Sequence, residues 1–475
     1  MSKYNKNILT NKIFKEVSKI AVSENTQVFV IGGFVRDLLL ENNNKKDIDF
    51  VIIGNGIDFA QKLAKSLKTK NISIYKTYGT AMFVYNDIEL EFVGARKESY
   101  NFNSRNPIVE EGSIEDDQKR RDFTINTLAI SLNKENFGEL IDPFNGISDL
   151  QNKIIRTPLN PDITFSDDPL RILRAIRFAS QLNFRIEENC FEAIKRNKER
   201  INIITAERIH TELNKILLSP KPSIGLMLLF SSGLLEIIFP ELYKLYGVIT
   251  QNEISHKDNF FHTIQVVDNV AQKSDNLWLR WAALLHDIAK PKTQKFVEGI
   301  GWTFYSHNFL GAKMVPQIFG RFRLPLNEKM RYVQKIVDLH MRPIALVEEG
   351  VTDSAIRRLV VDAGDDIEDL LILCEADITS KNEKKVTQYL ENFANVRKKI
   401  VEVEERDSLR NFQPPIDGQE IMEYFNIPAS RQVGIIKKAI KDAILDGEIP
   451  NDYQKCKEFM IEKGRELGLG ECTTG

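Results

Sequence analysis

A chain of 475 residues is too long for one ordinary hydrophobic core, so we expect several domains. Its 42% apolar and 28% charged residues are typical of a soluble globular protein, and we find no apolar run long enough to predict a transmembrane helix. The net charge of −2 excludes a uniformly basic nucleic-acid binder, so a nucleic-acid partner would require a local basic surface.

The chain begins with a polar stretch that lacks an apolar signal core, which indicates a cytoplasmic protein. Apolar and β-branched runs then predict strands at residues 27–32, 46–54 and 88–96. Helical patterns lie between them, at residues 35–40 and 59–68. We therefore expect residues 1–155 to form a small α/β domain on a mixed sheet.

From about residue 165 the apolar spacing becomes helical and strand signals mostly stop. We expect an all-α remainder in three parts: a neck at 156–250, a body at 251–385 and a tail at 386–475. The stretch 153–221 carries thirteen Lys/Arg against nine Asp/Glu, a modest basic excess. Five of the six histidines fall in the body.

A glycine turn and an aspartate pair form the first candidate site. Gly32 and Gly33 stand between a predicted strand and a helix that carries Arg36, where the backbone can approach a phosphate closely. Asp47 and Asp49 project to the same side of the next strand, because alternate residues of a strand share a face. Such a pair suits two divalent metals, and the alternative is a solvated strand end.

Glu91, on the third predicted strand, could supply a third carboxylate. An exposed strand face shared with Glu89 is the alternative interpretation.

Basic residues follow further along the chain. Arg121 could bind phosphate, and Asp122 could accept a hydrogen bond from a ribose hydroxyl. Arg171, Arg174 and Arg177 recur at steps of three, so their guanidinium groups form a row beside one helix face. A solvated helix face is the alternative for this row, but apolar residues bound it and carboxylates precede it.

These segments together resemble a known family. Gly-Gly-Phe-Val-Arg-Asp (32–37), followed by Asp-Ile-Asp (47–49), resembles the signature of polymerase-β-like nucleotidyltransferases. The segments 120–129, 142–150 and 167–177 resemble, in order, further motifs of bacterial-type (class II) CCA-adding enzymes and bacterial poly(A) polymerases. The resemblance covers residues 27–180.

The resemblance implies attack of an RNA 3′-hydroxyl on the α-phosphate of CTP or ATP, with release of pyrophosphate. Asp47 and Asp49 would be the catalytic residues and would hold Mg²⁺. Asp168 and Arg171 would read the base, because a carboxylate only accepts and a guanidinium only donates, which matches the Watson–Crick edge of C or A. The other nucleotide-binding residues would be Gly32, Gly33, Arg36, Arg121, Asp122, Asn126, Arg174 and Arg177.

A second candidate site lies in the body. The order His…His-Asp…His…His…Asp resembles the HD phosphohydrolase superfamily in its two-metal version. Imidazoles and carboxylates together suit a first-row transition metal such as Ni, Co or Mn. The alternative is an HD fold retained only as a scaffold. The candidate ligands are His262, His286, Asp287, His307, His340 and Asp377.

The sequence therefore predicts an enzyme that adds CCA to tRNA from CTP and ATP, with an HD phosphohydrolase activity. CC-only and A-only addition remain open, because the loop that would decide between full and partial addition, within 95–118, follows no spacing rule. Poly(A) synthesis is a less favoured alternative, because poly(A) polymerases tend to be strongly basic and to lack an HD domain. A metal-dependent HD phosphohydrolase with a non-catalytic RNA-binding head is the alternative from another class. The sequence predicts no membrane partner and leaves the oligomeric state open.

Overall fold

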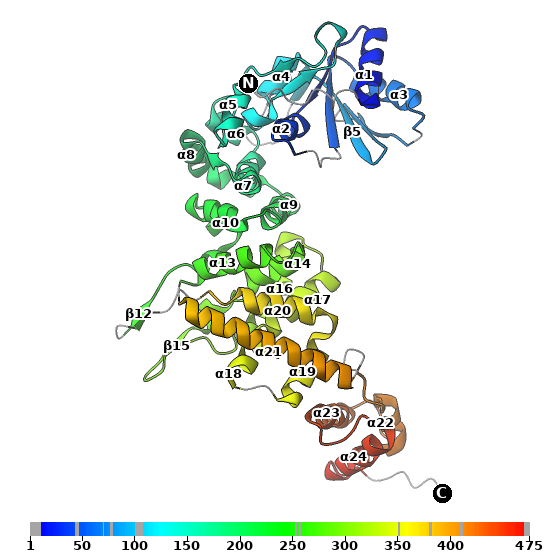
Figure 1. Ribbon diagram of the computed structural model, residues 1–475, viewed down its shortest axis with the longest axis vertical. Helices are drawn as coiled ribbons and strands as arrows, with labels where there is room; N and C mark the ends of the chain where they lie inside the picture. The colour runs from blue at the N-terminus through cyan, green and yellow to red at the C-terminus, as the bar shows by residue number, and fades with distance from the viewer. Residues whose placement is uncertain are drawn as a thin grey trace. The chain divides into compact units, whose positions relative to one another are not determined.

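The computed structural model describes residues 11–42, 47–69, 71–76, 79–99, 108–251, 254–255, 258–349, 352–379, 382–407 and 412–469. The chain divides into two compact units, Met1–Pro240 and Glu241–Gly475 (Figure 1). Part of the loop predicted within 95–118, residues 100–107, lies outside the described residues.

The first unit is built on a mixed sheet, as predicted. The described strands pair in the order β3-β4-β5-β2-β1-β8-β9. β2 and β5 run parallel, and the other neighbours run antiparallel. The strands are β1 (Val28–Ile31), β2 (Asp47–Ile52), β3 (Ser73–Tyr75), β4 (Thr80–Tyr85), β5 (Ile88–Gly94), β8 (Ala129–Ser131) and β9 (Leu140–Ile141).

One face of this sheet is apolar and is covered by helices α1 (Lys12–Ser23) and α3 (Gly56–Ser66) (Figure 1). Phe50 of β2 and Phe92 of β5 stack with ring centroids 4.8 Å apart. Phe14 of α1 packs on Phe50, and Phe59 of α3 packs on Phe92. Because side chains alternate along a strand, the neighbours of Phe50 and Phe92 project from the opposite face.

Short elements border that opposite face. They are α2 (Gly33–Leu39), the hairpin β6 (Arg96–Ser99) and β7 (Ile108–Glu111), α4 (Ile114–Lys119), the 3₁₀ turn η3 (Thr124–Asn126) and α5 (Gly146–Gln151). A capping box starts α4, in which Ser113 and Asp116 bond to each other's backbone N–H.

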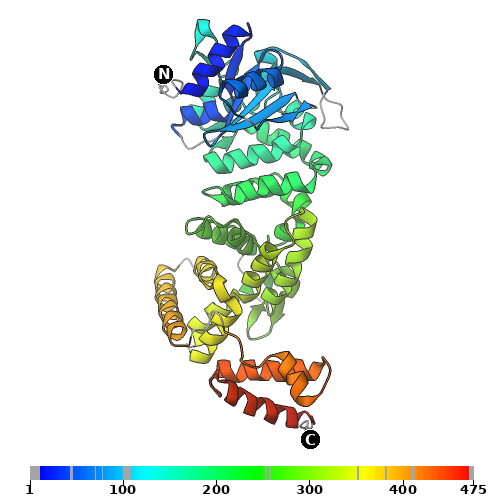
Figure 2. The same ribbon diagram turned by 90° about the vertical axis from the view of Figure 1, so that its right-hand side faces the viewer.

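Helices of the neck pack against one another after the sheet (Figures 1 and 2). α7 contacts α9 and α10, and α6 contacts α8. A short parallel pair, β10 (Ile154–Ile155) with β11 (Arg185–Ile186), adds strand structure that the sequence did not predict. The helices are α6 (Pro161–Asp167), α7 (Leu170–Leu182), α8 (Glu188–Asn197), α9 (Ala206–Leu217), α10 (Pro222–Ser231) and α11 (Leu234–Ile238), followed by α12 (Pro240–Tyr243) where the first unit ends.

The body in the second unit is helical, as predicted, and its core surrounds Trp281, which packs on Phe319 and Phe322. It also contains unpredicted two-stranded pairs, β12 (Thr250–Gln251) with β13 (Ile254–Ser255) and β14 (Lys295–Val297) with β15 (Gly301–Thr303). The helices are α13 (Asn259–Ala271), α14 (Leu277–Leu285), α15 (Lys290–Thr293), α16 (His307–Phe322), α17 (Glu328–Leu339), α18 (Met341–Glu349), α19 (Asp353–Ala363), α20 (Ile367–Ala376) and α21 (Glu383–Asp407).

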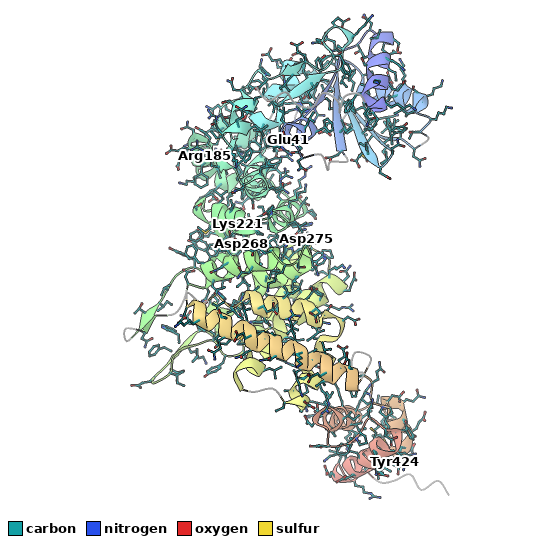
Figure 3. All side chains as sticks on the ribbon, viewed as in Figure 1. Glu41, Arg185, Lys221, Asp268, Asp275 and Tyr424 are labelled. Carbon is teal, nitrogen blue, oxygen red and sulfur yellow. The ribbon has the colours of Figure 1, made fainter. Side chains whose placement is uncertain are left out.

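The expected boundary between body and tail at 385/386 lies within α21, which packs on α18 and α19 of the body. The rest of the tail is a three-helix module of α22 (Gly418–Phe425), α23 (Arg431–Asp446) and α24 (Tyr453–Glu466) with its own apolar core. Tyr424, labelled in Figure 3, meets Phe425 edge to face at 5.0 Å. Arg358 of α19 ties the module to the body through Asp442 at 3.0 Å and Asp446 at 2.7 Å. Within the described residues, no helix combines the length and apolarity needed to span a membrane.

Two glycines of the tail make a matched test of its packing. A Cβ on Gly464 would lie 2.1 Å from Cζ of Phe425, whereas a Cβ on helical Gly434 would meet nothing within 4 Å. We expect Gly464→Ala to destabilise the tail by about 1–3 kcal/mol through overpacking. Gly434→Ala should stabilise it by about 0.5–1 kcal/mol, because alanine loses less backbone entropy in a helix.

Hydrogen exchange of residues 418–466 would measure both effects in the intact chain. Equal protection in the two variants would contradict this account of the Phe425 contact.

Candidate active site and metal centre

The carboxylates of the first candidate site lie on the face of the sheet opposite Phe50 and Phe92, next to the buried apolar cluster that contains Ile31 and Val51. In the parallel register Asp47 pairs with Glu89, and Asp49 pairs with Glu91. Asp49 and Glu91 are both half-buried, which a solvated strand end does not predict. Burial, with Asp49 as the next cause, raises the pKa of Glu91. Ionising both neighbouring carboxylates costs free energy, so a cation bound between them would be stabilised.

The glycine turn meets these carboxylates. Gly32 has φ of +81°, a conformation that other residues rarely adopt. A Cβ there would lie 3.0 Å from Nη1 of Arg121 and 3.4 Å from Oδ2 of Asp49. The turn at the start of α2 therefore has a guanidinium group and a carboxylate beside it.

A fully buried carboxylate, which the sequence analysis missed, holds Arg121 in place. Oδ2 of Asp117 accepts a hydrogen bond from Nε of Arg121 at 3.0 Å, and Oδ1 accepts one from Nε of Arg120 at 2.9 Å. Burial opposes ionisation of Asp117, but Arg121 and Arg120 outweigh it and lower its pKa. The signal was present, since Asp117 lies three and four residues before the two arginines on a helix.

Asp122 lies at the centre of a second buried network. Its Oδ2 accepts from Nε of Arg174 at 2.7 Å, and its Oδ1 accepts from the side-chain amide of Asn126 at 3.0 Å. The amide oxygen of Asn126 in turn accepts from Nη1 of Arg36 at 2.7 Å. Burial opposes ionisation, but Arg174 and Asn126 hold the pKa of Asp122 at about 2. Four predicted nucleotide-binding residues are thus linked directly.

The ring of Phe178 on α7 contacts three of the predicted nucleotide-binding arginines. The guanidinium groups of Arg177, Arg36 and Arg174 lie 4.1, 5.0 and 5.5 Å from its ring centroid, within cation–π range. Arg177 also pairs with buried Glu212 of α9 at 3.1 Å. Burial lowers the pKa of Arg177 to about 10. The arginine row exists, but the alternative of a solvated face is wrong, because Arg177 is only 6% exposed.

The two residues predicted to read the base stand where α7 begins. Oδ1 of Asp168 accepts from the N–H of Leu170 at 3.2 Å, and Nη2 of Arg171 donates to the carbonyl oxygen of Arg120 at 2.7 Å. Arg171 is therefore anchored beside the pair of arginines on the sheet side of the site.

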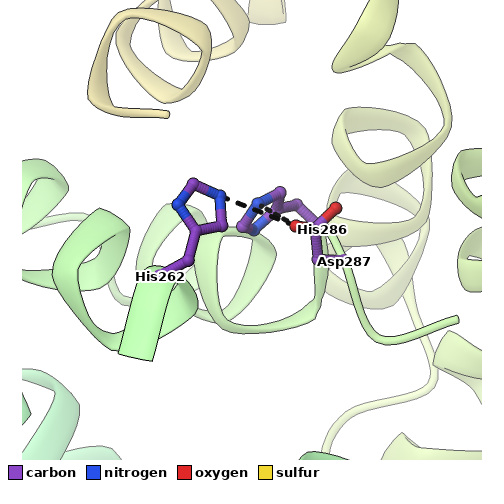
Figure 4. A group of neighbouring side chains, drawn as sticks. All are labelled: His262, His286 and Asp287. Atoms are coloured by element: carbon purple, nitrogen blue, oxygen red, sulfur yellow. Dashed lines mark ion pairs between the residues drawn. The ribbon is translucent and has the colours of Figure 1, made fainter. Parts of the chain in front are cut away.

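The six predicted ligands of the body come together in one buried cluster. Asp287 belongs to two triplets whose donor atoms lie within 4.8 Å of one another, one with His262 and His286 and one with His307 and His340. Figure 4 shows the first triplet, with His262 on α13 and the other two residues just after α14. Nε2 of His262 also lies 2.8 Å from Oδ1 of Asp377.

The histidines of this cluster are oriented by their outer ring nitrogens. Nδ1 of His286, His307 and His340 lies 2.7–2.8 Å from the backbone carbonyl oxygen three residues earlier. Nδ1 of His262 lies 2.8 Å from Oγ1 of Thr379. A proton on Nδ1 leaves the lone pair of each Nε2 directed into the cluster, which is the arrangement that metal ligation requires.

The charges of the cluster also suit a cation. Nε2 of His286 and Oδ2 of Asp287 are buried and lie 3.2 Å from each other, and Nζ of Lys290 lies 2.6 Å from the same carboxylate oxygen. Burial disfavours the charged ring of His286, but Asp287 and Asp377 raise its pKa to about 10. The carboxylates thus attract a positive charge that a divalent metal would supply.

Comparisons with known proteins agree with this architecture. Residues 28–156 match the poly A polymerase head domain, 183–245 the probable RNA and SrmB-binding site of polymerase A, and 259–382 the HD domain. A-adding tRNA nucleotidyltransferases are similar, from Aquifex aeolicus (38% identity over 61% of this chain) and Deinococcus radiodurans (30% over 73%). The alignment covers 35% of the Aquifex protein but 79% of the Deinococcus one. The multifunctional CCA protein of Psychromonas ingrahamii is 32% identical over 63% of this chain and 71% of its own length.

Solved structures share the fold. An apo form of a CCA-adding enzyme matches with a TM-score of 0.64 at 24% identity, over 96% of each chain. A tRNA nucleotidyltransferase complexed with a primer tRNA and an incoming ATP analog matches with a TM-score of 0.58 at 25% identity, over 80% of this chain and 99% of that one. Fold and matched domains define a polymerase-β-like nucleotidyltransferase head with an RNA-binding neck and an HD body. The chain belongs to the tRNA nucleotidyltransferase and poly(A) polymerase family.

The buried Asp122 network predicts a pH dependence. The pKa of Asp122 is depressed in the folded state, from 3.8 to about 2, so its stabilisation is complete above the unfolded pKa and is lost as the pH falls through the folded pKa. We expect Asp122→Asn to lower local stability at neutral pH by about 2 kcal/mol. That difference from the wild type should shrink between pH 4 and pH 2.

Hydrogen exchange of residues 118–131 across that pH range would measure the difference. Glu135→Gln, on an exposed turn of the same unit, is the control. A difference that stays constant with pH would contradict an ionised, arginine-paired Asp122.

Proposed function

We propose that the protein extends the 3′ end of tRNA with CCA, using CTP and ATP and releasing pyrophosphate. The observation that carries the proposal is the convergence of the Gly32 turn, Arg121 and the half-buried carboxylates Asp49 and Glu91 on one face of the sheet. The name of the Psychromonas relative, a multifunctional CCA protein, supports CCA addition, and the name of the Deinococcus relative supports nucleotide transfer to tRNA. A tRNA substrate would make the cytoplasm the place of action.

Each side chain takes a role that its position allows. Asp47 and Asp49 hold Mg²⁺, which would activate the 3′-hydroxyl and neutralise the leaving pyrophosphate. Gly32 and Gly33 let backbone N–H groups approach the phosphates, and Arg121 pairs with them. Asp122 accepts a hydrogen bond from the ribose hydroxyl, and Asn126 positions the carboxylate of Asp122. Arg36, Arg174 and Arg177 surround the nucleotide with positive charge, each held by a carboxylate partner.

Asp168 and Arg171 select the base. Cytosine and adenine each present an amine donor beside a ring-nitrogen acceptor, which a carboxylate and a guanidinium complement. Guanine and uracil present the reverse order. A mismatched contact leaves polar groups unpaired and costs about 1–3 kcal/mol.

A tRNA that ends at its discriminator base tests the proposal. With labelled CTP, ATP or both, we expect products longer by two, zero and three nucleotides, sized on a gel. Asp49→Ala and Asp47→Ala should abolish addition without unfolding the protein, because solvated or half-buried strand carboxylates contribute little to stability. Glu89→Gln, which changes the exposed register partner of Asp47, is the matched control and should retain activity.

Near-normal addition by either aspartate variant would remove the metal-binding assignment. Extension of only those tRNAs that already end in CC, with ATP alone, would identify the second candidate function, A addition. The names of the Aquifex and Deinococcus relatives favour that candidate. Long untemplated A tails on any RNA would identify a poly(A) polymerase.

We further propose that the body hydrolyses phosphoesters, such as a 2′,3′-cyclic phosphate or a phosphomonoester, at a transition-metal site formed by the six-residue cluster. The orientation of the four imidazoles supports a working site over a bare scaffold. We assign this activity to residues 251–385, nucleotide transfer to 1–155, and RNA contacts to 156–250 and 386–475.

Removing two ligands separates the two activities. We expect His286→Ala combined with Asp287→Ala to lose bound Ni, Co or Mn, measured by elemental analysis, and to lose hydrolysis of a 2′,3′-cyclic nucleotide. Nucleotide addition to tRNA should continue. His210→Ala, a histidine of α9 outside the cluster, is the control. A wild type that contains no metal and hydrolyses nothing with added Ni, Co or Mn would leave the scaffold interpretation. A wild type that hydrolyses the phosphoester but extends no tRNA would identify the alternative from another class, an HD phosphohydrolase with a non-catalytic RNA-binding head.

A further inference from the structure

Helices α16 and α17 pack against each other in the body (Figure 1). A pocket of about 520 Å³ is lined by both of them, and we call it the α16–α17 pocket. Phe309 and Lys313 of α16 contribute to its lining, as do Arg331 and Asp338 of α17. One residue each from α18 and α19 completes the lining. The volume falls in the range of small-ligand sites, and none of the roles proposed above uses this pocket.

The α16–α17 pocket is separate from the histidine–aspartate cluster. His307 begins α16, and His340 directly follows α17. Because a helix turns by about 100° per residue, Phe309 lies roughly 200° around α16 from His307. Asp338 lies roughly 200° around α17 from His340 for the same reason. The pocket lining therefore lies on faces of the two helices that point away from the cluster.

The pocket carries more positive charge than its carboxylates neutralise. Its charged lining residues are Lys313, Arg331, Lys335 and Arg342 against Asp338 and Asp362. Asp362 is already paired with Arg342, at 2.6 Å, and Lys335 is paired with Asp366 outside the pocket. Among the described residues, no carboxylate pairs with the other two cations, Lys313 and Arg331. An anion bound in the pocket would therefore be stabilised.

Phe309 gives the pocket an aromatic surface. It is 53% exposed, and Nζ of Lys313 lies 4.0 Å from the centroid of its ring. An exposed ring beside cations that lack a carboxylate partner offers a surface for stacking a base and charge for a phosphate. Asp338 and Gln334 supply a carboxylate and an amide for hydrogen bonds to ribose hydroxyls and to the edge of a base. A nucleotide combines all of these groups in one small ligand.

A neighbouring pocket of about 680 Å³ shares Arg331 and Lys335 with the α16–α17 pocket but differs in charge. Its lining adds one further cation, Lys329, and three carboxylates, Glu328, Asp366 and Asp369. Its positive and negative side chains are therefore equal in number. The excess of positive charge belongs to the α16–α17 pocket, which makes that pocket the better site for an anion.

We propose that the α16–α17 pocket binds a free nucleoside phosphate, with the phosphate against Lys313 and Arg331 and the base on Phe309. Asp338 accepts hydrogen bonds from the ribose hydroxyls. The volume suits one nucleotide and is too small for a folded RNA segment. The inference goes beyond the two proposed activities and depends on neither, because the pocket shares no side chain with the head site or with the histidine–aspartate cluster.

Calorimetric titration of the intact protein with AMP tests the charge requirement. EDTA in the buffer keeps metal out of the cluster, so that the phosphate cannot bind a metal there. We expect Lys313→Gln and Arg331→Gln each to raise the Kd for AMP about ten- to hundredfold, the range for a lost hydrogen bond to a charged group. Lys329→Gln also removes a positive charge from α17, but Lys329 lines only the neighbouring one of these two pockets, so this variant should keep the wild-type Kd. An equal loss in Lys329→Gln, or an unchanged Kd in Lys313→Gln, would overturn the proposal.

Ribose 5-phosphate, which lacks the base, tests the role of Phe309. We expect Phe309→Leu to raise the Kd for AMP about five- to hundredfold, the range for loss of one stacked base, and to leave the Kd for ribose 5-phosphate unchanged. Tyr305→Leu is the matched control, because Tyr305 is an exposed aromatic residue just before α16 and outside the pocket lining. Equal affinity of the wild type for AMP and ribose 5-phosphate would overturn the assignment of a nucleotide.

Photocross-linking places the ligand on the chain. 8-Azido-AMP irradiated on the wild-type protein in EDTA should attach to peptides that contain residues 309–313 or 331–342, which line the pocket. Attachment confined to residues 1–240 would place AMP in the head alone and would overturn the proposal. Protection of these peptides by a short oligoribonucleotide, but not by AMP, would overturn the assignment of a free nucleotide. Neither nucleotide addition nor phosphoester hydrolysis enters these measurements, so a failure of the proposed activities would leave their outcome unchanged.

Discussion

The parallel pairing of β2 with β5 is the constraint on which the head depends. It places Phe50 on Phe92 on one face and Asp49 beside Glu91 on the other. The apolar stack under α1 and α3 thus holds the two carboxylates side by side, although they repel each other. A slip of one residue in the register would move the carboxylates to the face covered by α1 and α3 and the two aromatic rings to the other face. The fold therefore cannot relieve the repulsion without a large cost in free energy, whereas a cation bound between the carboxylates would relieve it.

Buried carboxylates position the arginines around this centre. Asp37, Asp117, Asp122 and Glu212 each pair with at least one guanidinium group. Such pairs add little net stability, because desolvation offsets most of the Coulomb attraction. Their value lies in orientation, since a guanidinium group already fixed toward the substrate needs little reorganisation when charge develops there. The neck and head are therefore joined by the groups that would contact the nucleotide, with Arg174 of α7 bonded to Asp122 of the sheet domain.

The sequence could predict what local patterns determine. The runs that became β1, β2 and β5 are apolar, and the glycine turn and aspartate pair stand at their ends. β3 and β4 were not predicted. β3 is an edge strand of only three residues, with Tyr75 47% exposed, whereas β4 (TAMFVY) has the composition of a strand and could have been predicted. β14 and β15 are three residues long and depend on a cross-strand pair, Phe296 with Trp302. Ion-pair partners that are distant in sequence, such as Glu212 for Arg177, depend on how the helices pack, and no local sequence pattern indicates them.

The candidate metal site of the body shows why its histidines and aspartates could be found in the sequence while their orientation could not. His286 and His340 directly follow α14 and α17, where the last carbonyl groups of a helix have no N–H partner within it. Those carbonyls, of Ala283 and Val337, lie against Nδ1 of each ring. The end of each helix therefore supplies a hydrogen-bond acceptor for Nδ1 of His286 or His340, and no side chain is needed for that purpose. His262, inside α13, has no such carbonyl available, and its Nδ1 instead meets Thr379, two residues after Asp377. The candidate ligands can be found in the sequence because only a few residue types, here histidine and aspartate, can serve. A backbone carbonyl is present in every residue, so the sequence does not show which carbonyl orients a histidine until the ends of the helices are known.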